Sequence, residues 1–377
     1  MLDRARLRRR RTAVAIATSA LLSWRGTSSI EGFITLSASV VPLPAISFGM
    51  THCMTYGYDM LHPVPFLPRD VIQPCVEESV ALVRAAFEAS SGKLGIDSAD
   101  NYDAHDALRI VLREQPRDSY FLATKIASKQ PVIGGFLYGY PGDRGETTHD
   151  AHNKTAEAVD CELANLGLAY VDMLLLHEPP VMAVGREDEV CCVLREQWRA
   201  LEGAYFAGKA KAIGVSNYCP PLLECLLATA RVRPHVNQLN VHVGSSLEAL
   251  QAWGPAYGVP LQAYSALGSV DGSNAAMLEA GGPAARIGEA HHGKSAAQVA
   301  LRWLVQHGIP LVFVSTSRAH IAQSYGALDD SFELTAGEMS ALDAWRPPPA
   351  PQNVVGLDWD RPNAFAIYAS RNVCRGA

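Results

Sequence analysis

The chain has 377 residues, of which 48% are hydrophobic and 19% are charged, and its formal net charge at pH 7 is −6. This length fits one large domain or two ordinary ones, and the composition is that of a soluble globular protein with a sizeable core. The negative net charge gives no reason to expect a nucleic-acid partner.

Residues 1–30 differ from everything that follows them. Residues 1–11 are rich in arginine, 12–24 are largely apolar, and 25–29 are small and polar after Arg25. This order suits a signal or organelle-targeting segment, so the expected location is cytoplasmic or organellar. A disordered extension or a misassigned start codon is the alternative. The apolar stretch is too short for a comfortable membrane span and no later stretch is long enough, so we expect no stable span in the mature protein.

The next segment, 34–50, contains alternating apolar residues and two prolines. It predicts a small hairpin followed by a first strand at 46–49. Aromatic residues and prolines are frequent in 51–73, which we interpret as a loop long enough to be functional. A helix is predicted over 74–90, because a proline opens that segment and two acidic residues follow in its first turn.

Seven further short apolar runs each end on a polar or aromatic residue, at 95–97, 121–125, 173–177, 212–217, 236–238, 261–264 and 311–315. Helices are predicted at 104–114, 155–166, 187–207, 220–230, 246–257, 295–307 and 336–345. This alternation predicts parallel strands crossed by helices, and chemically useful groups at nearly every strand exit favour a (β/α)8 TIM barrel. The hairpin would plug the barrel floor.

This interpretation divides the chain into an extension at 1–30, a barrel at 31–346 and a C-terminal coil at 347–377 that lies over the active site. The segment 127–153 is rich in glycine and aromatic residues. Together with 51–73 it is predicted to form the long loops over the C-terminal face of the barrel.

The eight cysteines lie at 53, 75, 161, 191, 192, 219, 225 and 374. No pair has the C-x-x-C spacing of a metal or redox site, and the fraction is too low for a disulfide scaffold. We therefore expect reduced thiols in an intracellular compartment. Cys191 and Cys192 are expected to sit on a helix as small hydrophobic residues rather than to form a switch.

Four residues at or just past successive strand ends form a chemically coherent set: Asp97, Tyr102, Lys125 and His177. A phenol is a poor acid at neutral pH, and a nearby ammonium is expected to lower its pKa. Asp97 would keep Lys125 charged, and the imidazole of His177 could position and polarise a carbonyl oxygen. The set suits carbonyl reduction by hydride from a nicotinamide, with Tyr102 as the proton donor.

The chain here resembles the aldo-keto reductase superfamily, in particular its aldose or aldehyde reductase-like and diketogulonate reductase-like members. Several ordered motifs carry the resemblance, at 95–102, 163–172 with 177–179, 198–202 with 208–217, 236–238, 263–268 and 297–303. The resemblance covers about residues 33 to 345. It implies that Asp97, Tyr102, Lys125 and His177 are the catalytic tetrad.

The resemblance also implies a cofactor site across the barrel mouth. Ser216, Asn217 and Gln238 would hydrogen-bond the nicotinamide carboxamide, and Tyr264 would stack on its ring. Three further residues, Ser265, Leu267 and Ser269, would line the pyrophosphate loop. No G-x-G-x-x-G follows a strand, so a Rossmann domain is not expected.

The chain departs from the family pattern after its last strand. The family's Ile-Pro-Lys-Ser, whose Lys and a later Arg hold the 2′-phosphate of NADP, corresponds here to a stretch that lacks the Lys, and Ser324 replaces the usual Asn. Ser315, Ser317 and Arg318 are the candidate residues at this end, since a guanidinium suits a phosphate. NADPH is therefore the expected cofactor, with NADH as an alternative.

Glu178 follows His177 where many relatives have an aromatic wall to the substrate pocket. We hypothesise that this carboxylate disfavours anionic keto acids and favours polar or hydroxylated aldehydes. The alternative is that Glu178 turns aside and pairs with a surface cation.

The expected function is NAD(P)H-dependent reduction of a small aldehyde or ketone by a monomer or weak oligomer. Serine hydrolysis is poorly supported because Gly214–Tyr218 lacks the second Gly of a nucleophile elbow. Metal hydrolysis is poorly supported because no histidine pair has H-E-x-x-H spacing, and no metal site is expected. The main rival is a catalytically weak NADP(H)-binding regulatory subunit on the same barrel, and a degraded enzyme is a third reading.

Overall fold

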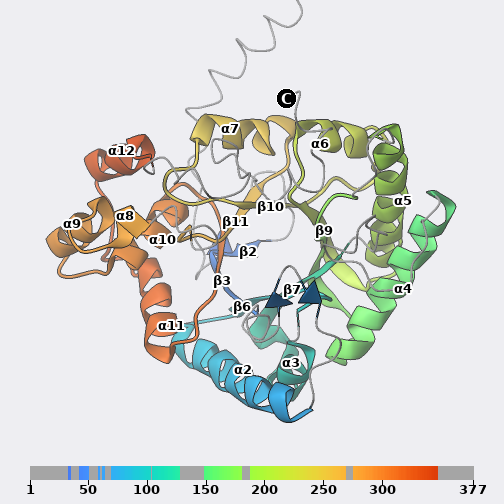
Figure 1. Ribbon diagram of the computed structural model, residues 1–377, viewed down its shortest axis with the longest axis horizontal. Helices are drawn as coiled ribbons and strands as arrows, with labels where there is room; N and C mark the ends of the chain where they lie inside the picture. The colour runs from blue at the N-terminus through green and yellow to red at the C-terminus, as the bar shows by residue number, and fades with distance from the viewer. Residues whose placement is uncertain are drawn as a thin grey trace, which may run out of the picture.

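The computed structural model describes residues 33–34, 42–50, 58–59, 62–63, 69–102, 104–127, 148–180, 187–268 and 275–346. Eight parallel strands close into a barrel in the order β3, β6, β7, β8, β9, β10, β11 and β12, and helices surround them (Figure 1). Their bounds are Ile46–Gly49, Leu94–Asp97, Tyr120–Ile126, Val171–Leu176, Ala210–Ser216, Asn237–Asn240, Leu261–Tyr264 and Leu311–Phe313, respectively. Every expected strand is present, which confirms the predicted (β/α)8 barrel.

Most barrel strands are apolar because one face lines the barrel interior and the other packs against helices. All seven residues of β7 and all six of β8 are buried. Side chains two positions apart meet inside the barrel, in a cluster of Leu43, Phe121, Ala123, Met173, Leu175, Ala212 and Val236. Gly214 faces the same crowded space, since a Cβ there would come within 2.7 Å of Leu175.

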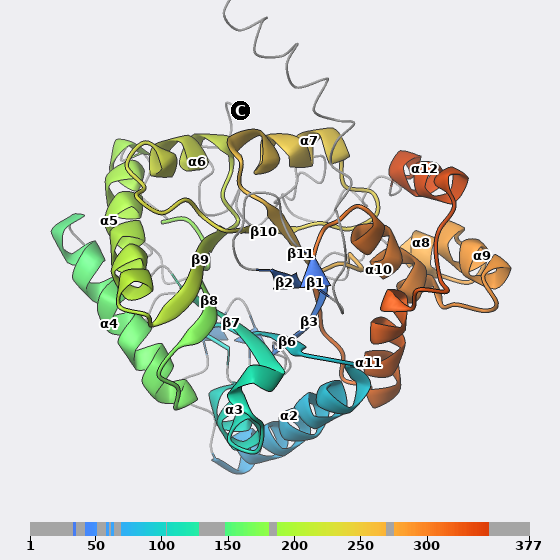
Figure 2. The same ribbon diagram turned by 180° about the vertical axis from the view of Figure 1, so that it is seen from behind.

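A two-stranded antiparallel hairpin closes the barrel floor. It pairs β1 (Phe33–Ile34) with β2 (Leu43–Pro44), and Figure 2 shows both strands over the centre of the barrel. Leu43 is fully buried in the interior cluster, at the end of the barrel where the strands begin. This arrangement confirms the expected plug.

The helices lie outside the strands as a ring (Figure 1). Those described are α2 Arg69–Ala89, α3 His105–Leu112, α4 Thr148–Leu166, α5 Glu187–Phe206, α6 Pro220–Leu227, α7 Leu247–Ala252, α8 Ala275–Leu278, α9 Pro283–Ala290, α10 Ala296–Gln306, α11 Arg318–Tyr325 and α12 Ala336–Ala344. The capping box of α10, formed by Ser295 and Gln298, begins that helix where the sequence predicted. Gly208, with φ +75°, follows the end of α5 as expected.

Two helix starts were predicted wrongly. Helix α2 begins at Arg69, so Pro74 lies in its second turn instead of opening it. A proline so near the start removes one backbone hydrogen bond, and the helix continues through it. Helix α4 begins at Thr148, seven residues before the predicted start, because its first turns are polar and carry no apolar stripe apart from the buried Ala151.

Other elements were not predicted or are shorter than predicted. The short helices α8, α9 and α11 were not expected, and residues 58–59 pair with 62–63 as a small antiparallel ladder within the expected loop. The helix expected over 246–257 breaks after α7, and a 3-10 turn, Pro255–Tyr257, follows Gly254. Gly-Pro is a strong breaker, which explains the interruption.

Some predictions fall on residues outside the described ones. They are the targeting segment at 1–30, most of the loops at 51–73 and 127–153, and the C-terminal coil at 347–377. Among the helices that the structure describes, none combines the length and apolar character needed to cross a membrane.

The expectation of reduced thiols was wrong. Cys191 of α5 and Cys225 of α6 form a disulfide, with their Cα atoms 5.8 Å apart and a sequence separation of 34. Cys75 and Cys219 are also disulfide-bonded, whereas Cys161 and Cys192 are free and exposed. A search for C-x-x-C tests only cysteines close in sequence, and the packing of α5 on α6 brings distant ones together. The inference of a reducing compartment loses its support with it.

The Cys191–Cys225 disulfide should stabilise the fold. Replacing both residues by serine should lower the free energy of unfolding by about 2–4 kcal/mol, because a closed loop of this size restricts the unfolded chain. Urea unfolding under oxidising conditions measures the effect. The matched control is Cys192→Ser, the exposed free thiol beside Cys191, which should change stability little; equal effects of the two variants would contradict the prediction.

Candidate active site

The four residues of the predicted tetrad lie at one end of the barrel. Asp97 is the last residue of β6, Lys125 is the last but one of β7, and His177 directly follows β8. Tyr102 lies in the turn after β6, where its backbone N–H donates to the Ala99 carbonyl. Because these strands are parallel neighbours, their C-terminal ends bring the four side chains to the same face.

A buried ion pair forms the base of this site. Lys125 Nζ donates to Asp97 Oδ1 over 2.5 Å and to the Ser98 carbonyl over 2.9 Å. Lys125 is 1% exposed and Asp97 3%. Removing two charges from water costs several kcal/mol for each, so such a pair is tolerated only when further hydrogen bonds satisfy it. Asp97 Oδ2 accepts one of these, from Gln238 Nε2 over 2.8 Å.

Tyr102 and His177 meet above the ion pair. The Tyr102 hydroxyl lies 3.4 Å from His177 Nε2, and the two rings pack edge to face with centroids 5.5 Å apart. Lys125 Nζ lies 5.0 Å from the centroid of the Tyr102 ring. All four predicted residues are therefore brought together.

The protonation of this cluster differs from the expectation. Burial raises the pKa of the Tyr102 phenol, and the negative charges of Asp97, Glu178 and Asp100 raise it further. The expected lowering of this pKa was therefore wrong for this state, chiefly because burial disfavours the charged phenolate. Burial, followed by the charge of Lys125, lowers the pKa of His177 well below its usual value. At neutral pH the site therefore holds a protonated phenol beside a neutral imidazole.

The residues predicted for the nicotinamide lie on the neighbouring strands. Ser216 ends β9, Asn217 follows it, Gln238 lies on β10, and Tyr264 ends β11. Asn217 adopts φ +67°, a left-handed conformation that asparagine tolerates better than most residues. Its Nδ2 donates to the His177 carbonyl over 3.0 Å, and its Oδ1 accepts from the Tyr264 hydroxyl over 2.8 Å. Asn217 thus connects the tetrad side of the mouth to the predicted stacking residue.

The predicted phosphate end is less complete. Ser265, with φ +49°, begins a turn in which the Gly268 N–H donates to its carbonyl, and Leu267 lies partly buried in that turn. Ser269 lies outside the described residues. Beyond β12, the Ser315 hydroxyl accepts from the Ser317 N–H, and Ser317 caps α11 by accepting from the His320 N–H.

The two positions where the family pattern has a cation offer little positive charge to a phosphate here. Val314, 46% exposed, precedes Ser315 where the family pattern has lysine. Arg318 pairs with Glu88 over 2.8 Å, and both side chains are largely exposed. Such a surface pair is worth about 0–1 kcal/mol, so it competes only modestly with another anion for the guanidinium.

Glu178 lies beside the tetrad. Its Oε2 is 3.6 Å from His177 Nδ1, just beyond hydrogen-bond distance, and its side chain is 21% exposed. Its charge raises the pKa of Tyr102 and also that of the buried Tyr218, after the effect of burial in both cases. The Glu178 carboxylate therefore contributes to the electrostatic environment of the site.

One polar residue of the barrel interior was missed by sequence reasoning. Gln262, on β11 and 2% exposed, accepts from Gln238 Nε2 over 2.8 Å. The available signal was its position in a strand with period two, where it shares the interior-facing side with Tyr264 and not with Leu261 and Ala263.

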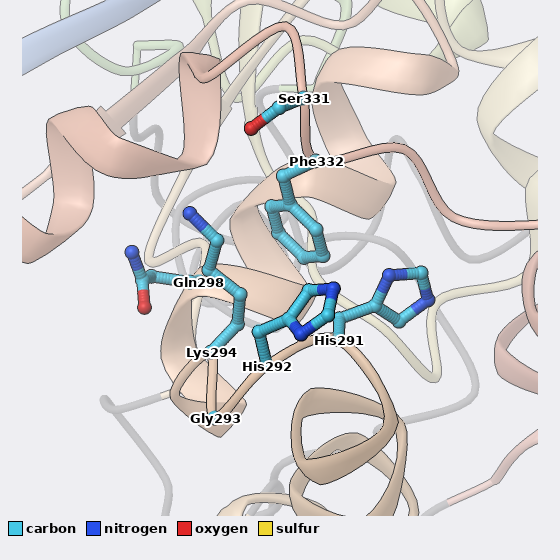
Figure 3. Close-up of a pocket in the computed structure, with 7 residues that line it drawn as sticks. All are labelled: His291, His292, Gly293, Lys294, Gln298, Ser331 and Phe332. Atoms are coloured by element: carbon cyan, nitrogen blue, oxygen red, sulfur yellow. The ribbon is translucent and has the colours of Figure 1, made fainter.

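The structure also contains a cavity of about 420 Å³ away from the tetrad. It lies at the connection of α9 to α10 and is lined by His291, His292, Gly293, Lys294, Gln298, Ser331 and Phe332 (Figure 3). Lys294 pairs there with Asp329 over 3.1 Å. None of the predicted site residues lines it.

The sequence was compared with known families and proteins. Residues 73–346 match the model of the aldo/keto reductase family. A 9,11-endoperoxide prostaglandin H2 reductase of Trypanosoma cruzi (strain CL Brener) is 31% identical over 268 residues, which are 71% of this chain and 82% of that protein. A glyoxal reductase of Bacillus subtilis (strain 168) is 31% identical over 269 residues, which are 71% of this chain and 83% of that protein.

Solved structures agree with these matches. The aldo/keto reductase from Brucella melitensis superposes with a TM-score of 0.61 at 25% identity and covers 83% of this chain and 99% of that one. The Bombyx mori aldo-keto reductase in complex with NADP has a TM-score of 0.60 at 22% identity, covering 84% and 93%, and shows the fold alone.

Proposed function

Because the chain belongs to the aldo/keto reductase family of oxidoreductases, we propose that it reduces a small aldehyde or ketone to the alcohol with NAD(P)H, using Tyr102 as the general acid. The observation that carries this proposal is the position of Tyr102: its hydroxyl lies 3.4 Å from His177 Nε2, and Lys125 Nζ lies 5.0 Å from the centroid of its ring. The rival, a weakly catalytic regulatory subunit, does not need these four side chains to meet.

The roles follow from charge and protonation. NAD(P)H, when bound, supplies the hydride for the carbonyl carbon. Negative charge then develops on the carbonyl oxygen, and a proton donor held near that oxygen lowers the barrier. The Tyr102 phenol is protonated at neutral pH and so has a proton to donate, and the neutral His177 can hold the substrate oxygen beside it. Lys125, fixed by Asp97, stabilises the phenolate that remains.

The nicotinamide end of the mouth fits a cofactor. Gln238 Oε1 accepts no hydrogen bond from any residue in the described part of the chain, so it offers an acceptor to a carboxamide. Ser216 and Asn217 would bind the other end of that group, and Tyr264 would stack on the ring. Ser265, Leu267 and Ser269 would line the pyrophosphate. Because Val314 replaces the expected lysine, we propose that NADPH is preferred over NADH only weakly.

The substrate side of the proposal concerns charge. Glu178, beside His177, would repel an anionic substrate while it accepts hydrogen bonds from hydroxyl groups. The Bacillus subtilis relative is named a glyoxal reductase, so small neutral aldehydes such as glyoxal are suitable first substrates.

Replacing Tyr102 by phenylalanine tests the reaction itself. We expect kcat for reduction of a small aldehyde to fall by about two orders of magnitude or more, the scale of a general acid, while NADPH affinity stays near that of the wild type. Single-turnover oxidation of bound NADPH measures the chemical step. A wild-type protein that binds NADPH but does not oxidise it with any of a panel of aldehydes, ketones and keto acids would favour the regulatory subunit.

Replacing Val314 by lysine tests the phosphate end. The new cation should raise the ratio of kcat/KM for NADPH over NADH by about two- to fivefold, the effect of one exposed charge pair. The gain should shrink at high salt because the contact is exposed. Val314→Gln, long and polar without charge, is the control; an unchanged ratio in the lysine variant would place the 2′-phosphate elsewhere.

Replacing Glu178 by glutamine tests the substrate preference. Methyl 4-formylbenzoate and 4-formylbenzoate differ by one charge at the same scaffold. The wild type should prefer the neutral ester by about fivefold or more, since two like charges a few ångströms apart repel by about 1 kcal/mol or more. Glu178→Gln should remove most of this preference. If the ratio of kcat/KM values stays as in the wild type, Glu178 does not select substrates by charge.

A further inference from the structure

Gln238 connects two sides of the barrel through one amide group. Its strand, β10, lies directly opposite β6 in the closed order of eight strands. Its Nε2 nevertheless reaches Asp97 Oδ2 at the end of β6 over 2.8 Å, so this hydrogen bond crosses the barrel interior. The same Nε2 donates to Gln262 Oε1 on the adjacent strand, where the two glutamines are register partners.

The direction of these hydrogen bonds is set by charge. A carboxylate paired with an ammonium can only accept, so the Gln238 atom facing Asp97 must be its amide nitrogen. The second hydrogen on that nitrogen then requires an acceptor, and the Gln262 atom facing it must be the carbonyl oxygen. All three residues are at most 3% exposed, so an unsatisfied hydrogen would carry the full cost of burial.

Two hydrogen bonds from one amide nitrogen restrict the orientation of the amide group more than a single hydrogen bond does. With Asp97 alone, the Gln238 amide could turn about the N–H···O direction. The contact with Gln262 prevents this rotation and thereby fixes where Gln238 Oε1 points. An apolar residue at position 262 would leave that oxygen free to turn and the second hydrogen unpaired.

We propose that Gln262 is a positioning residue of the cofactor site: by holding the Gln238 amide against Asp97, it directs Gln238 Oε1 to accept from the amino group of the nicotinamide carboxamide. This proposal rests on the proposed function and deepens it. Gln262 acts only through Gln238 and touches neither substrate nor tetrad in the described contacts. Through these hydrogen bonds, the orientation of the bound nicotinamide ring would depend on the Lys125–Asp97 ion pair near Tyr102.

The test uses two nucleotides that differ at the amino group. In the 3-acetylpyridine analogue of NADP⁺, a methyl group replaces the carboxamide NH2, so the proposed donor is absent. The wild type should bind NADP⁺ about fivefold more tightly than the analogue, the effect of one neutral hydrogen bond. Equilibrium binding followed by protein fluorescence gives both dissociation constants without relying on catalysis.

Two variants separate positioning from packing. Gln262→Met keeps most of the volume and removes the strong acceptor, so the ratio of the two dissociation constants should fall to about one. Gln262→Glu keeps an acceptor oxygen at the same place, and its ratio should stay within about twofold of the wild type. A purely structural role would change both dissociation constants equally and leave the ratio intact. Gln262→Leu serves as the second apolar variant should the methionine variant not fold.

The outcomes are distinct. An unchanged ratio in the folded methionine or leucine variant, or a wild-type ratio of one, overturns the role of Gln262 and leaves the proposed reaction standing. A wild type that binds neither nucleotide overturns the proposed function and this inference together.

Discussion

The buried ion pair of Lys125 and Asp97 determines how the polar groups around it at the mouth of the barrel are arranged. Two charges at 1% and 3% exposure persist only where their remaining hydrogen-bonding capacity is met, and here Ser98, on one side, and Gln238, from the opposite wall, meet it. Burial, and after it the negative charge of Asp97, raises the pKa of the Tyr102 phenol that lies beside this pair. Hydrogen bonds through this pair therefore connect β6 and β7 with β10, which lies opposite β6 in the barrel.

The fold could be predicted largely because a parallel barrel has a simple signature in sequence. Most of its strands are short apolar runs buried on both faces, and β8, with six buried residues, shows the pattern clearly. Helix starts were harder, as α4 shows: its first turns are polar and have no stripe to detect. The Cys191–Cys225 disulfide was not predictable, because it depends on how two helices pack and not on the spacing of cysteines.

The candidate site likewise has features that could be predicted from the sequence and features that could not. Asp97, Lys125 and His177 could be placed together because each stands at the end of a strand, and strand ends of one sheet share a face. The protonation of Tyr102 could not, since burial and three nearby carboxylates set its pKa, and none of these follows from residue type. The partnership of Gln238 with Asp97 across the interior requires the closure of the barrel, which brings opposite strands face to face.

The Cys191–Cys225 disulfide between α5 and α6 makes the stability of the protein depend on the redox conditions around it. This disulfide joins α5, which precedes β9, to α6, which follows β9. Strand β9 ends on Ser216. A cystine survives only where the ambient thiol potential is more oxidising than its own. In a compartment that reduces this disulfide, only the packing between α5 and α6 would hold the two helices together. The steady-state amount of folded protein should accordingly follow the redox poise of the compartment in which it resides.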